Sequence, residues 1–324
     1  MGGDNNDRDA LVKRILPQMK FADGTTNLPA YHTSKPAPQH AAAGRFAVRG
    51  NAIITGGLGN LGLEGARALL EHGLSGVALF DVNPTADSPE LSALKSDFPH
   101  AKIVAKKVDV TDAEHVEQAV KETASELRSV DILACYAGVV NCVHALDTPA
   151  AEFRRTLDIN TTGVFLCAQA VARWFYCDHC MLVLHLCHLP THQLTNQAIS
   201  AHSVNFPQPQ VSYNASKAAL IHLKSSLAAE WARYGIRTNT ISPGYMDTIL
   251  NEGDGIAVGR KIWTERNPMG RMGHPSELTG PLVLLCSAAG SYINGADLVV
   301  DGKYPLQNYF GLVLIYPIGG LTVF

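Results

Sequence analysis

The chain has 324 residues, of which 46% are hydrophobic and 17% are charged, and its formal net charge at pH 7 is −3. This composition is typical of a soluble globular protein with a substantial core, built as one large α/β domain or as two small ones. The low net charge gives no support to a nucleic-acid partner or to binding at a charged membrane surface. The 7 cysteines are an odd number with no secretion signal before them, which favours reduced thiols and a cytoplasmic location.

Residues 1–45 differ in composition from the rest of the chain. They begin with a polar stretch, contain Pro17, Pro29, Pro36 and Pro38, and have one short apolar patch. Such a segment cannot bury enough apolar surface to fix its backbone, so we expect a flexible N-terminal arm. The arm starts with acidic residues and lacks a long hydrophobic region, so neither a secretory nor a transit peptide fits well.

Between residues 46 and 302, short β-rich runs alternate with helical stretches. This alternation predicts a single α/β domain, a doubly wound, mostly parallel, Rossmann-like sheet with helices on both faces. Ligands of such sheets bind at the carboxyl ends of the strands, where the strand order reverses. The predicted strands cover residues 51–55, 76–82, 102–108, 130–134 and 237–241, and the predicted helices cover residues 61–71, 116–127, 153–174 and 215–234.

A glycine-rich loop from Thr55 to Gly62 joins the first predicted strand to its helix. Glycine permits a tight turn and lets backbone N–H groups approach a pyrophosphate at a helix N-terminus. Many turns are rich in glycine, but this position between a strand and a helix favours a dinucleotide-binding loop.

The second predicted strand ends in Asp81. A carboxylate at this point accepts hydrogen bonds from an adenosine ribose and repels a 2′-phosphate, so it favours NAD(H) while leaving NADP(H) open. The glycine-rich loop contains no Arg or Lys that would hold such a phosphate. The alternative is that Asp81 only begins the turn that leads to Pro84.

Tyr213 and Lys217 are four residues apart in a predicted buried helix, so their side chains project from one face of it. A phenol with a pKa near ~10 is a poor acid or base at neutral pH, and a nearby ammonium group lowers that pKa. The pair is therefore a candidate acid/base. The alternative is a surface Tyr and Lys that share this common spacing by chance.

Taken together, the ordered segments between Arg45 and Gly302 resemble the short-chain dehydrogenase/reductase family. The residues from Asn205 to Gln210, which lead into Tyr213, resemble more narrowly the members that act on polyols and ketoses. The segments that carry the resemblance are the loop at 55–62, Asp109-Val110-Thr111, Ala137-Gly138, Asn160, Tyr213 with Lys217, Pro243-Gly244 and Asp301-Gly302.

The resemblance implies a catalytic set. Tyr213 would exchange a proton with the substrate oxygen, and Lys217 would lower the pKa of Tyr213 and hold the nicotinamide ribose. Ser200 would hydrogen-bond the reacting oxygen, and Asn160 would complete a proton relay through water. The implied cofactor-binding residues are Gly56, Leu58, Asn60, Leu61, Gly62, Asp81, Asp109, Val110, Ala137, Gly138, Tyr213, Lys217, Pro243, Gly244 and Thr248.

Three residues depart from the family pattern. Asn60 replaces a glycine, and we expect the turn to survive because Asn tolerates the left-handed conformation. Tyr136 replaces the Asn before Ala-Gly, which predicts a bulky ring near the path of the adenosine. Lys303 replaces a second glycine after Asp-Gly.

Residues 177–197 form an atypical insert before Ser200. The apolar run 181–186 is predicted to supply the strand that precedes Ser200, which leaves about a dozen residues between them. Cys177, Cys180, His188 and His192 have zinc-like spacing, but chance enrichment is the preferred interpretation and no metal is predicted. A further alternative is that residues 177–197 are a translated intron or a mis-joined exon, and the same alternative applies to the tail at residues 303–324.

The atypical tail, residues 303–324, is apolar and uncharged from residue 309 onward and is broken by Pro317 and two glycines. It is too short for a comfortable membrane span. A strand that covers the core, or an irregular tail, is favoured over a membrane anchor.

The sequence therefore predicts an NAD(P)(H)-dependent oxidoreductase that interconverts a secondary alcohol and a ketone, a small polyol or ketose, with Tyr213 as the acid/base. The family resemblance also implies a homodimer or homotetramer, and the composition gives no reason to expect nucleic-acid or membrane partners. One alternative is a catalytically impaired NAD-binding protein, a sensor or partner-binding module, in which the insert displaces Ser200. The other is a mis-spliced gene product.

Overall fold

The computed structural model of the protein describes residues 17–21, 41–84, 88–176, 192–196, 199–204, 207–248 and 257–302. The tail at 303–324, most of the arm at 1–45 and most of the insert at 177–197 lie outside these residues. The predictions about them, including the one that concerns the Cys and His residues from Cys177 to His188, therefore lie outside the described residues as well.

The described residues form one parallel sheet of seven strands with the order β3-β2-β1-β4-β5-β6-β7. The strand order reverses between β1 and β4, so the predicted doubly wound sheet is confirmed. Open sheets of this kind bind ligands at the point of reversal. The strands are β1 (Asn51–Thr55), β2 (Gly76–Asp81), β3 (Lys102–Lys107), β4 (Ile132–Cys135), β5 (His192–Asn196), β6 (Arg237–Pro243) and β7 (Asp297–Val300).

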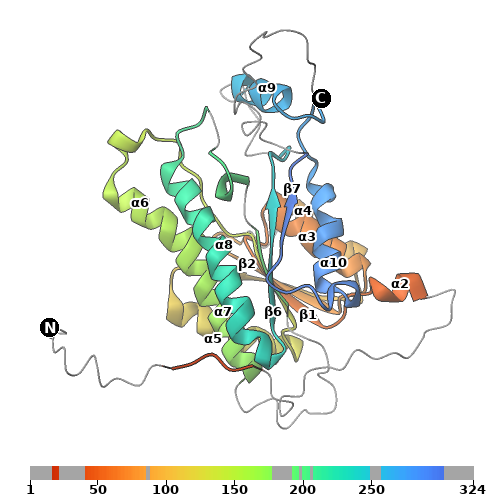
Figure 1. The fold of residues 1–324 in the computed structure, drawn as a ribbon. Coiled ribbons are helices and arrows are strands. Elements are labelled where there is room, and N and C mark those ends of the chain that lie inside the picture. Colours follow the sequence, from red (N-terminus) through yellow and green to blue (C-terminus); the bar gives the residue numbers. More distant parts are fainter. Residues whose placement is uncertain are drawn as a thin grey trace, which may run out of the picture.

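Helices cover both faces of the sheet. On one face α3 packs against α10 and α4, and on the other α7 packs against α5, with α8 beside it (Figure 1). The described helices are α2 (Ala41–Arg45), α3 (Asn60–Glu71), α4 (Pro89–Asp97), α5 (Ala113–Leu127), α6 (Ala150–Leu157), α7 (Gly163–Tyr176), α8 (Val211–Trp231), α9 (Ala257–Glu265) and α10 (Thr279–Cys286).

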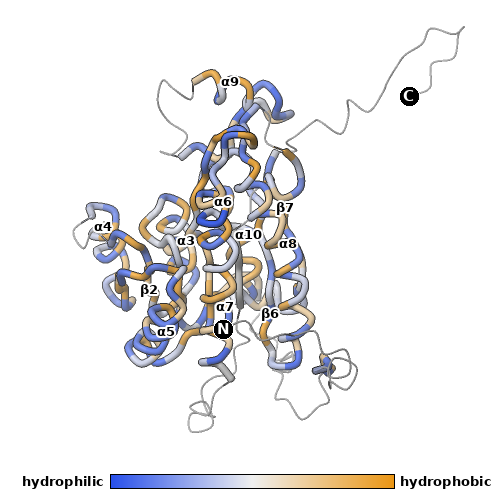
Figure 2. Tube along the Cα trace, turned by 90° about the vertical axis from the view of Figure 1, so that its left-hand side faces the viewer, coloured by the Kyte–Doolittle hydropathy of each residue, from blue (hydrophilic) through white to orange (hydrophobic). Residues whose placement is uncertain are grey.

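Two hydrophobic clusters follow from the alternation of side chains along the central strands. Ala52 and Ile54 of β1 point into the cluster under α3 and α10, whereas Ile53 points into the cluster under α5 and α7. Because both faces of β1 are buried, the strand reads as a continuous apolar run. Helices α3 and α5 each bury one side, so hydrophilic and hydrophobic residues alternate along them (Figure 2).

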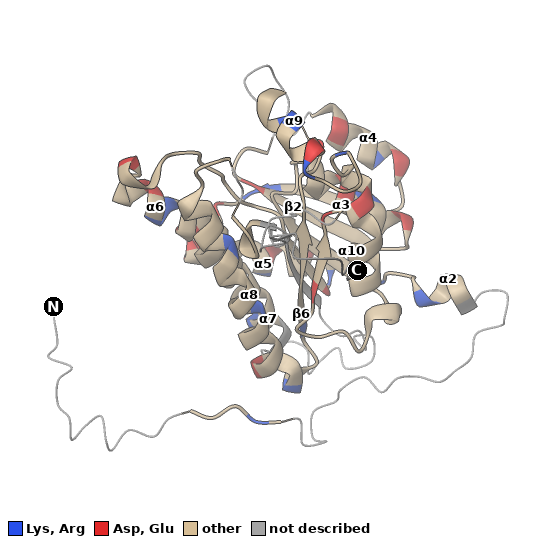
Figure 3. Cartoon of the chain, turned by 45° about the horizontal axis from the view of Figure 1, so that its top comes forward, with Lys and Arg blue, Asp and Glu red and all other residues tan. Residues whose placement is uncertain are grey.

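Charged residues of both signs are scattered over the outer helices, as Figure 3 shows. Some of them form ion pairs between neighbouring elements on this surface, for example Arg67 of α3 with Asp97 of α4 at 2.7 Å. In the part of the chain that the structure describes, no helix is long and apolar enough to cross a membrane.

The predicted helix at 153–174 is interrupted by one π-helical turn, Asp158–Thr162, between α6 and α7. Here the N–H of Gly163 donates to the carbonyl of Asp158, five residues earlier. A π turn inserts one extra residue into a helix and is frequent at functional sites. This turn contains Asn160.

The strand before Ser200 is His192–Asn196, where we expected the apolar run 181–186, which lies outside the described residues. His192–Asn196 pairs in parallel with β4 on one side and with β6 on the other. A central strand is fixed by backbone hydrogen bonds to two neighbours, which a run of mixed polarity satisfies as well as an apolar one. As a result the strand ends only a few residues before the turn Ile199–Ala201, which carries Ser200.

Candidate active site

The glycine-rich loop is shaped by close backbone contacts after β1. Gly56 has a φ of +62°, and a Cβ atom added there would lie 2.7 Å from the N atom of Ala137. A Cβ at Gly57 would lie 2.8 Å from the Cα of Leu79, and one at Gly62 would overlap the carbonyl oxygen of Gly56. These three positions therefore require glycine, because backbone atoms fill the space of a side chain.

The loop leads directly into the N-terminus of α3. Gly59 is the N-cap residue, and no side chain caps this helix end. The first N–H groups of a helix have no partner within the helix, and together with the helix dipole they favour an anion. Leu58, Leu61 and the glycine cradle thus offer a backbone site that fits a pyrophosphate.

Asn60 is the first residue of α3. Among the described residues, Arg128 is the only residue other than glycine with a positive φ. The turn therefore does not depend on a left-handed conformation at Asn60. Gly56 makes the tight turn four residues earlier, and Asn60 is already helical.

Asp81 ends β2 beside the glycine-rich loop. One carboxylate oxygen lies 3.4 Å from the N–H of Leu58, and the other accepts a hydrogen bond from the N–H of Asn83 at 3.2 Å. The side chain remains partly exposed. It is therefore oriented toward the loop and still accessible to a ligand.

Asp109 and Val110 follow β3 but have different surroundings. Asp109 is exposed and accepts hydrogen bonds from the N–H and the hydroxyl of Thr111, which lower the pKa of its carboxyl. Val110 is buried, and a Cβ added at Gly163 of α7 would lie 2.7 Å from its side chain. The side chain of Val110 is part of the core.

The loop after β4 contains Tyr136, Ala137 and Gly138. The N–H of Ala137 donates to the hydroxyl of Thr55 at 3.3 Å, which joins this loop to the end of β1. Tyr136 packs toward α3 and α10, since a Cβ added at Gly65 would lie 3.1 Å from its phenol oxygen. The ring therefore fills space between the two helices, and its distance from the path of the adenosine stays a prediction.

Asn160 is fully buried and is held by three hydrogen bonds. Its carbonyl accepts from the N–H of Val139 at 2.8 Å, and its amide donates to the carbonyl of Val139 at 2.9 Å and to the hydroxyl of Ser216 at 3.0 Å. Ser216 in turn donates to the carbonyl of Tyr213 at 2.7 Å. Asn160 thus links the loop after β4 to the second turn of α8.

Ser216 was not identified from the sequence as a functional residue. It lies between Tyr213 and Lys217 and, like Lys217, is buried on the inner side of α8. Its position next to Lys217 in a buried helix was the only available indication, and that observation alone does not distinguish it from a core residue.

Ser200 lies in the turn after β5 and hydrogen-bonds the phenol of Tyr213. Ser200 is 4% exposed, whereas Tyr213 keeps part of its surface exposed. Burial raises the pKa of Tyr213 to about 12, and the hydrogen bond from Ser200 opposes this shift. The geometry does not favour the alternative in which the insert displaces Ser200 from Tyr213.

Lys217 is buried one turn beyond Tyr213, and its Nζ atom lies 5.6 Å from the centre of the Tyr213 ring. Burial lowers the pKa of Lys217 to about 8. From the sequence we expected the ammonium group to lower the pKa of Tyr213, whereas in this structure desolvation of the phenol dominates. The predicted proximity is correct, and the lowering of the Tyr213 pKa by Lys217 stays a prediction.

The segment that follows β6 is held close to the end of β7. The N–H of Gly244, which follows Pro243, donates to the carbonyl of Val300 at 2.9 Å. A Cβ at Gly244 would lie 2.8 Å from the Cα of Asp301, so this position also requires glycine. Thr248 is buried just beyond this strand end.

A stacked aromatic pair adjoins this segment and was not predicted. Tyr245 and Trp263 lie with their ring centres 4.1 Å apart and nearly parallel. The hydroxyl of Tyr245 donates to the side-chain carbonyl of Gln208 at 2.6 Å. The stack fixes the segment after Pro243 against α9, and no local pattern links these residues because they come from three separate segments.

Within the described ranges, no group of three or more His, Cys, Asp or Glu side chains is close enough to hold a metal ion. The arrangement provides a hydroxyl and a phenol that face one another, a buried amine beside them and a glycine cradle at a helix N-terminus. Such donors stabilise an oxygen atom that gains negative charge during a reaction.

Known proteins resemble this chain over most of its length. A profile of the family described as enoyl-(acyl carrier protein) reductase matches residues 57–304. An NADP-dependent mannitol dehydrogenase of Alternaria alternata is 34% identical over 264 residues, 80% of this chain and 94% of that protein. A ribulose-forming D-arabinitol 2-dehydrogenase of Candida tropicalis is 36% identical over 273 residues, 78% of this chain and 91% of that protein.

The crystal structure of a short-chain type dehydrogenase/reductase from Mycobacterium marinum is also similar, with a TM-score of 0.71 and 36% identity. The similarity covers 80% of this chain and 97% of that one. The chain therefore belongs to the short-chain dehydrogenase/reductase family and is an NAD(P)-dependent oxidoreductase that interconverts an alcohol and a ketone.

Proposed function

We propose that this enzyme interconverts a polyol and the corresponding ketose at a secondary hydroxyl group. The observation that carries the proposal is the hydrogen bond between Ser200 and Tyr213 beside buried Lys217, next to a loop that requires glycine. The similarity to dehydrogenases named for mannitol and D-arabinitol supports a polyol as the substrate.

In this proposal each polar side chain of the site has one task. When bound, the nicotinamide ring supplies the hydride for ketone reduction and takes it up in alcohol oxidation. Tyr213 donates its phenol proton to the ketone oxygen, and Ser200 holds that oxygen by a hydrogen bond. Lys217 stabilises the phenolate that remains, because a positive charge favours the ionised form of a neighbouring acid.

Asn160 is assigned to support this group. Its side chain is occupied by Val139 and Ser216, so it fixes the start of α8 relative to the loop after β4. We assign the backbone of this π turn to hold the water of a proton relay, since π turns are frequent at functional sites.

The glycine cradle and the N-terminus of α3 fit the pyrophosphate of a dinucleotide, and Asp81 fits its adenosine ribose. We assign the loop from Gly56 to Gly62, with Leu58, Asn60 and Leu61, to the pyrophosphate. Asp109, Val110, Ala137 and Gly138 border the adenosine in this assignment, and Pro243, Gly244 and Thr248 border the nicotinamide.

The proposal is tested by measuring turnover of NADH and NADPH with a panel of ketoses, and of NAD⁺ and NADP⁺ with the matching polyols. We expect turnover with at least one ketose, and none with aldoses that lack a ketone group. Simple ketones serve as the control for an oxidoreductase of another substrate class. Binding of NADH without turnover of any compound in the panel would contradict the proposal.

Asp81 is assigned to set the preference for NAD(H), because a carboxylate repels the 2′-phosphate of NADP(H). The names of the NADP-dependent relatives raise the opposite expectation, which makes this residue the one to test. We expect Asp81→Asn to raise the ratio of kcat/KM for NADPH to that for NADH by roughly tenfold or more, since the change removes one negative charge.

The control is Asp147→Asn, which removes the same charge from an exposed position outside the site. We expect this variant to leave the ratio unchanged. The assignment fails if wild-type enzyme prefers NADPH, or if the ratio is the same in wild type and Asp81→Asn.

A further inference from the structure

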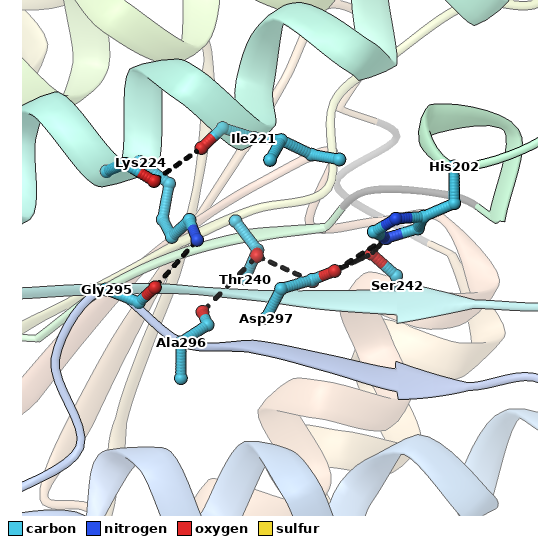
Figure 4. A network of polar contacts seen from close by, with 9 residues as sticks. His202, Ile221, Lys224, Thr240, Ser242, Gly295, Ala296 and Asp297 are labelled. Carbon is cyan, nitrogen blue, oxygen red and sulfur yellow. Dashed lines mark hydrogen bonds and ion pairs between the residues drawn. The ribbon is translucent and has the colours of Figure 1, made fainter.

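A polar cluster lies directly behind the turn that carries Ser200. Its centre is Asp297, the first residue of β7, whose carboxylate accepts hydrogen bonds from three side chains (Figure 4). Thr240 donates at 2.6 Å and Ser242 at 2.8 Å, both from β6, and Nε2 of His202 lies 2.6 Å away. His202 also approaches the hydroxyl of Ser242 at 3.3 Å.

The chemistry of Asp297 fixes the direction of its contact with His202. An ionised carboxylate only accepts hydrogen bonds, so Nε2 of His202 carries the hydrogen. The side chain of Asp297 is only 12% exposed, so its carboxylate oxygens accept hydrogen bonds from protein donors in place of water. Hydrogen bonds to an ionised group are short and directional, so this contact holds the imidazole in one place.

The turn that carries Ser200 depends on such an anchor. Ile199–Ala201 is a single 3₁₀ turn that lies between α8 and β6. Turns of this kind are short and have poor hydrogen-bond geometry of their own, so contacts with neighbouring elements set their position. Ser200 faces Tyr213 on α8, whereas His202, two residues later, faces Asp297 on the sheet.

We propose that His202 and Asp297 are positioning residues for the reaction, because together they hold the turn at the distance at which Ser200 reaches the phenol of Tyr213. The proposal rests on the proposed function of Ser200 and Tyr213 and adds two residues to it. His202 acts through the turn and not on the reacting atoms. A displacement of about 1 Å in a reacting group reduces rates by roughly 10²-fold, so a weaker anchor has a measurable effect.

The test compares His202→Ala, His202→Gln and Lys224→Met. Glutamine carries an N–H group at about the place of Nε2, so it can donate to Asp297, whereas alanine cannot. Lys224 is a matched control, because it is buried on α8 and its Nζ atom donates to the carbonyl of Gly295, just before β7, at 2.7 Å (Figure 4). Its loss weakens the attachment of the same strand without affecting the Ser200 turn.

We expect His202→Ala to lower kcat about tenfold to a hundredfold, with the Kd of NADH within threefold of wild type. We expect His202→Gln to restore kcat to within about threefold of wild type. Lys224→Met should lower the melting temperature and leave kcat within about twofold. If His202→Ala keeps wild-type kcat, or if Lys224→Met loses as much kcat, the proposal is overturned.

A second measurement does not require turnover. Enzyme with ¹³C at the Cζ atoms of tyrosine gives a Tyr213 resonance that is assigned by its absence in Tyr213→Phe. We expect His202→Ala to move this resonance in the same direction as Ser200→Ala, and His202→Gln to leave it near the wild-type position. If the wild-type enzyme turns over none of the tested compounds, the proposed function fails, while this spectrum still decides whether His202 positions Ser200. An unchanged resonance in His202→Ala contradicts the proposal.

Discussion

Tyr213→Phe is expected to lower kcat for ketone reduction by roughly 10²-fold to 10⁴-fold, the usual contribution of a general acid. The substitution removes only the phenol oxygen, which hydrogen-bonds Ser200, and keeps the ring in place on α8. Steady-state kinetics and a fluorescence titration with NADH measure the effect. We expect the Kd of NADH to change by no more than a few-fold, since the oxygen acts on the substrate.

Tyr292→Phe is the control for this substitution, because Tyr292 is fully exposed on the surface. It should retain wild-type kcat. A Tyr213→Phe enzyme that keeps more than about a tenth of wild-type turnover would remove Tyr213 from the role of acid/base.

The pH dependence of the wild-type enzyme gives a second view of the same residue. Burial raises the pKa of Tyr213 to about 12, so at neutral pH the phenol is protonated and ready to act as an acid in ketone reduction. Alcohol oxidation needs the phenolate, whose population increases with pH. We therefore expect kcat/KM for oxidation to rise between pH 6 and pH 8, while kcat/KM for reduction stays nearly constant over this range.

The charge of Lys217 affects the same pH dependence. Its pKa is lowered to about 8, so below that pH it is positively charged and favours the phenolate. Lys217→Met should accordingly move the rise in the oxidation profile to higher pH. An oxidation rate that falls between pH 6 and pH 8 in the wild-type enzyme would contradict this assignment.

Gly56→Ala is expected to weaken NADH binding by roughly tenfold or more, because a residue with a Cβ atom is strained by about 1–2 kcal/mol at a left-handed position. Gly56 has a φ of +62°, and the added atom would lie 2.7 Å from the N atom of Ala137 and 2.9 Å from its Cα. The two backbone segments must separate, which moves the loop after β4 away from the glycine cradle. Fluorescence titration with NADH measures the loss.

Thermal melting with and without NADH separates a binding defect from unfolding. A ligand that binds only the native state raises the melting temperature, so a folded variant with weak binding shows a smaller increase. Gly280→Ala is the control, because a Cβ at this position in α10 meets no other atom within 4 Å. Binding of NADH by Gly56→Ala with wild-type affinity would show that the loop tolerates a side chain at its tightest point.

Local patterns in the sequence were sufficient for the elements with regular periodicity. Asn51–Thr55 and Gly76–Asp81 are buried on both faces, so they appear as apolar runs that lead into turn residues. The spacing of Tyr213 and Lys217 was sufficient to place both on one face of α8, since i and i+4 positions of a helix are neighbours. Their proximity was therefore predictable, but the pKa of Tyr213 was not, because burial depends on the surrounding fold.

The fifth strand shows where local patterns fail. The run 181–186 is more hydrophobic than His192–Asn196, yet His192–Asn196 pairs with both β4 and β6. Pairing is a property of three segments that are far apart in the sequence, so no periodicity within one of them determines it. The same holds for the π turn at Asp158–Thr162, which the pattern merged into one long helix.

By itself, the sequence determined the fold class, the glycine-rich loop, the acidic end of β2 and the Tyr213–Lys217 pair, because each depends on residues close together in the chain. Only the tertiary structure decided that Ser200 reaches Tyr213, that Tyr136 packs between α3 and α10, and that Asp297 meets His202. These contacts join residues from separate segments, and their geometry is set by strand order and helix packing across the whole sheet.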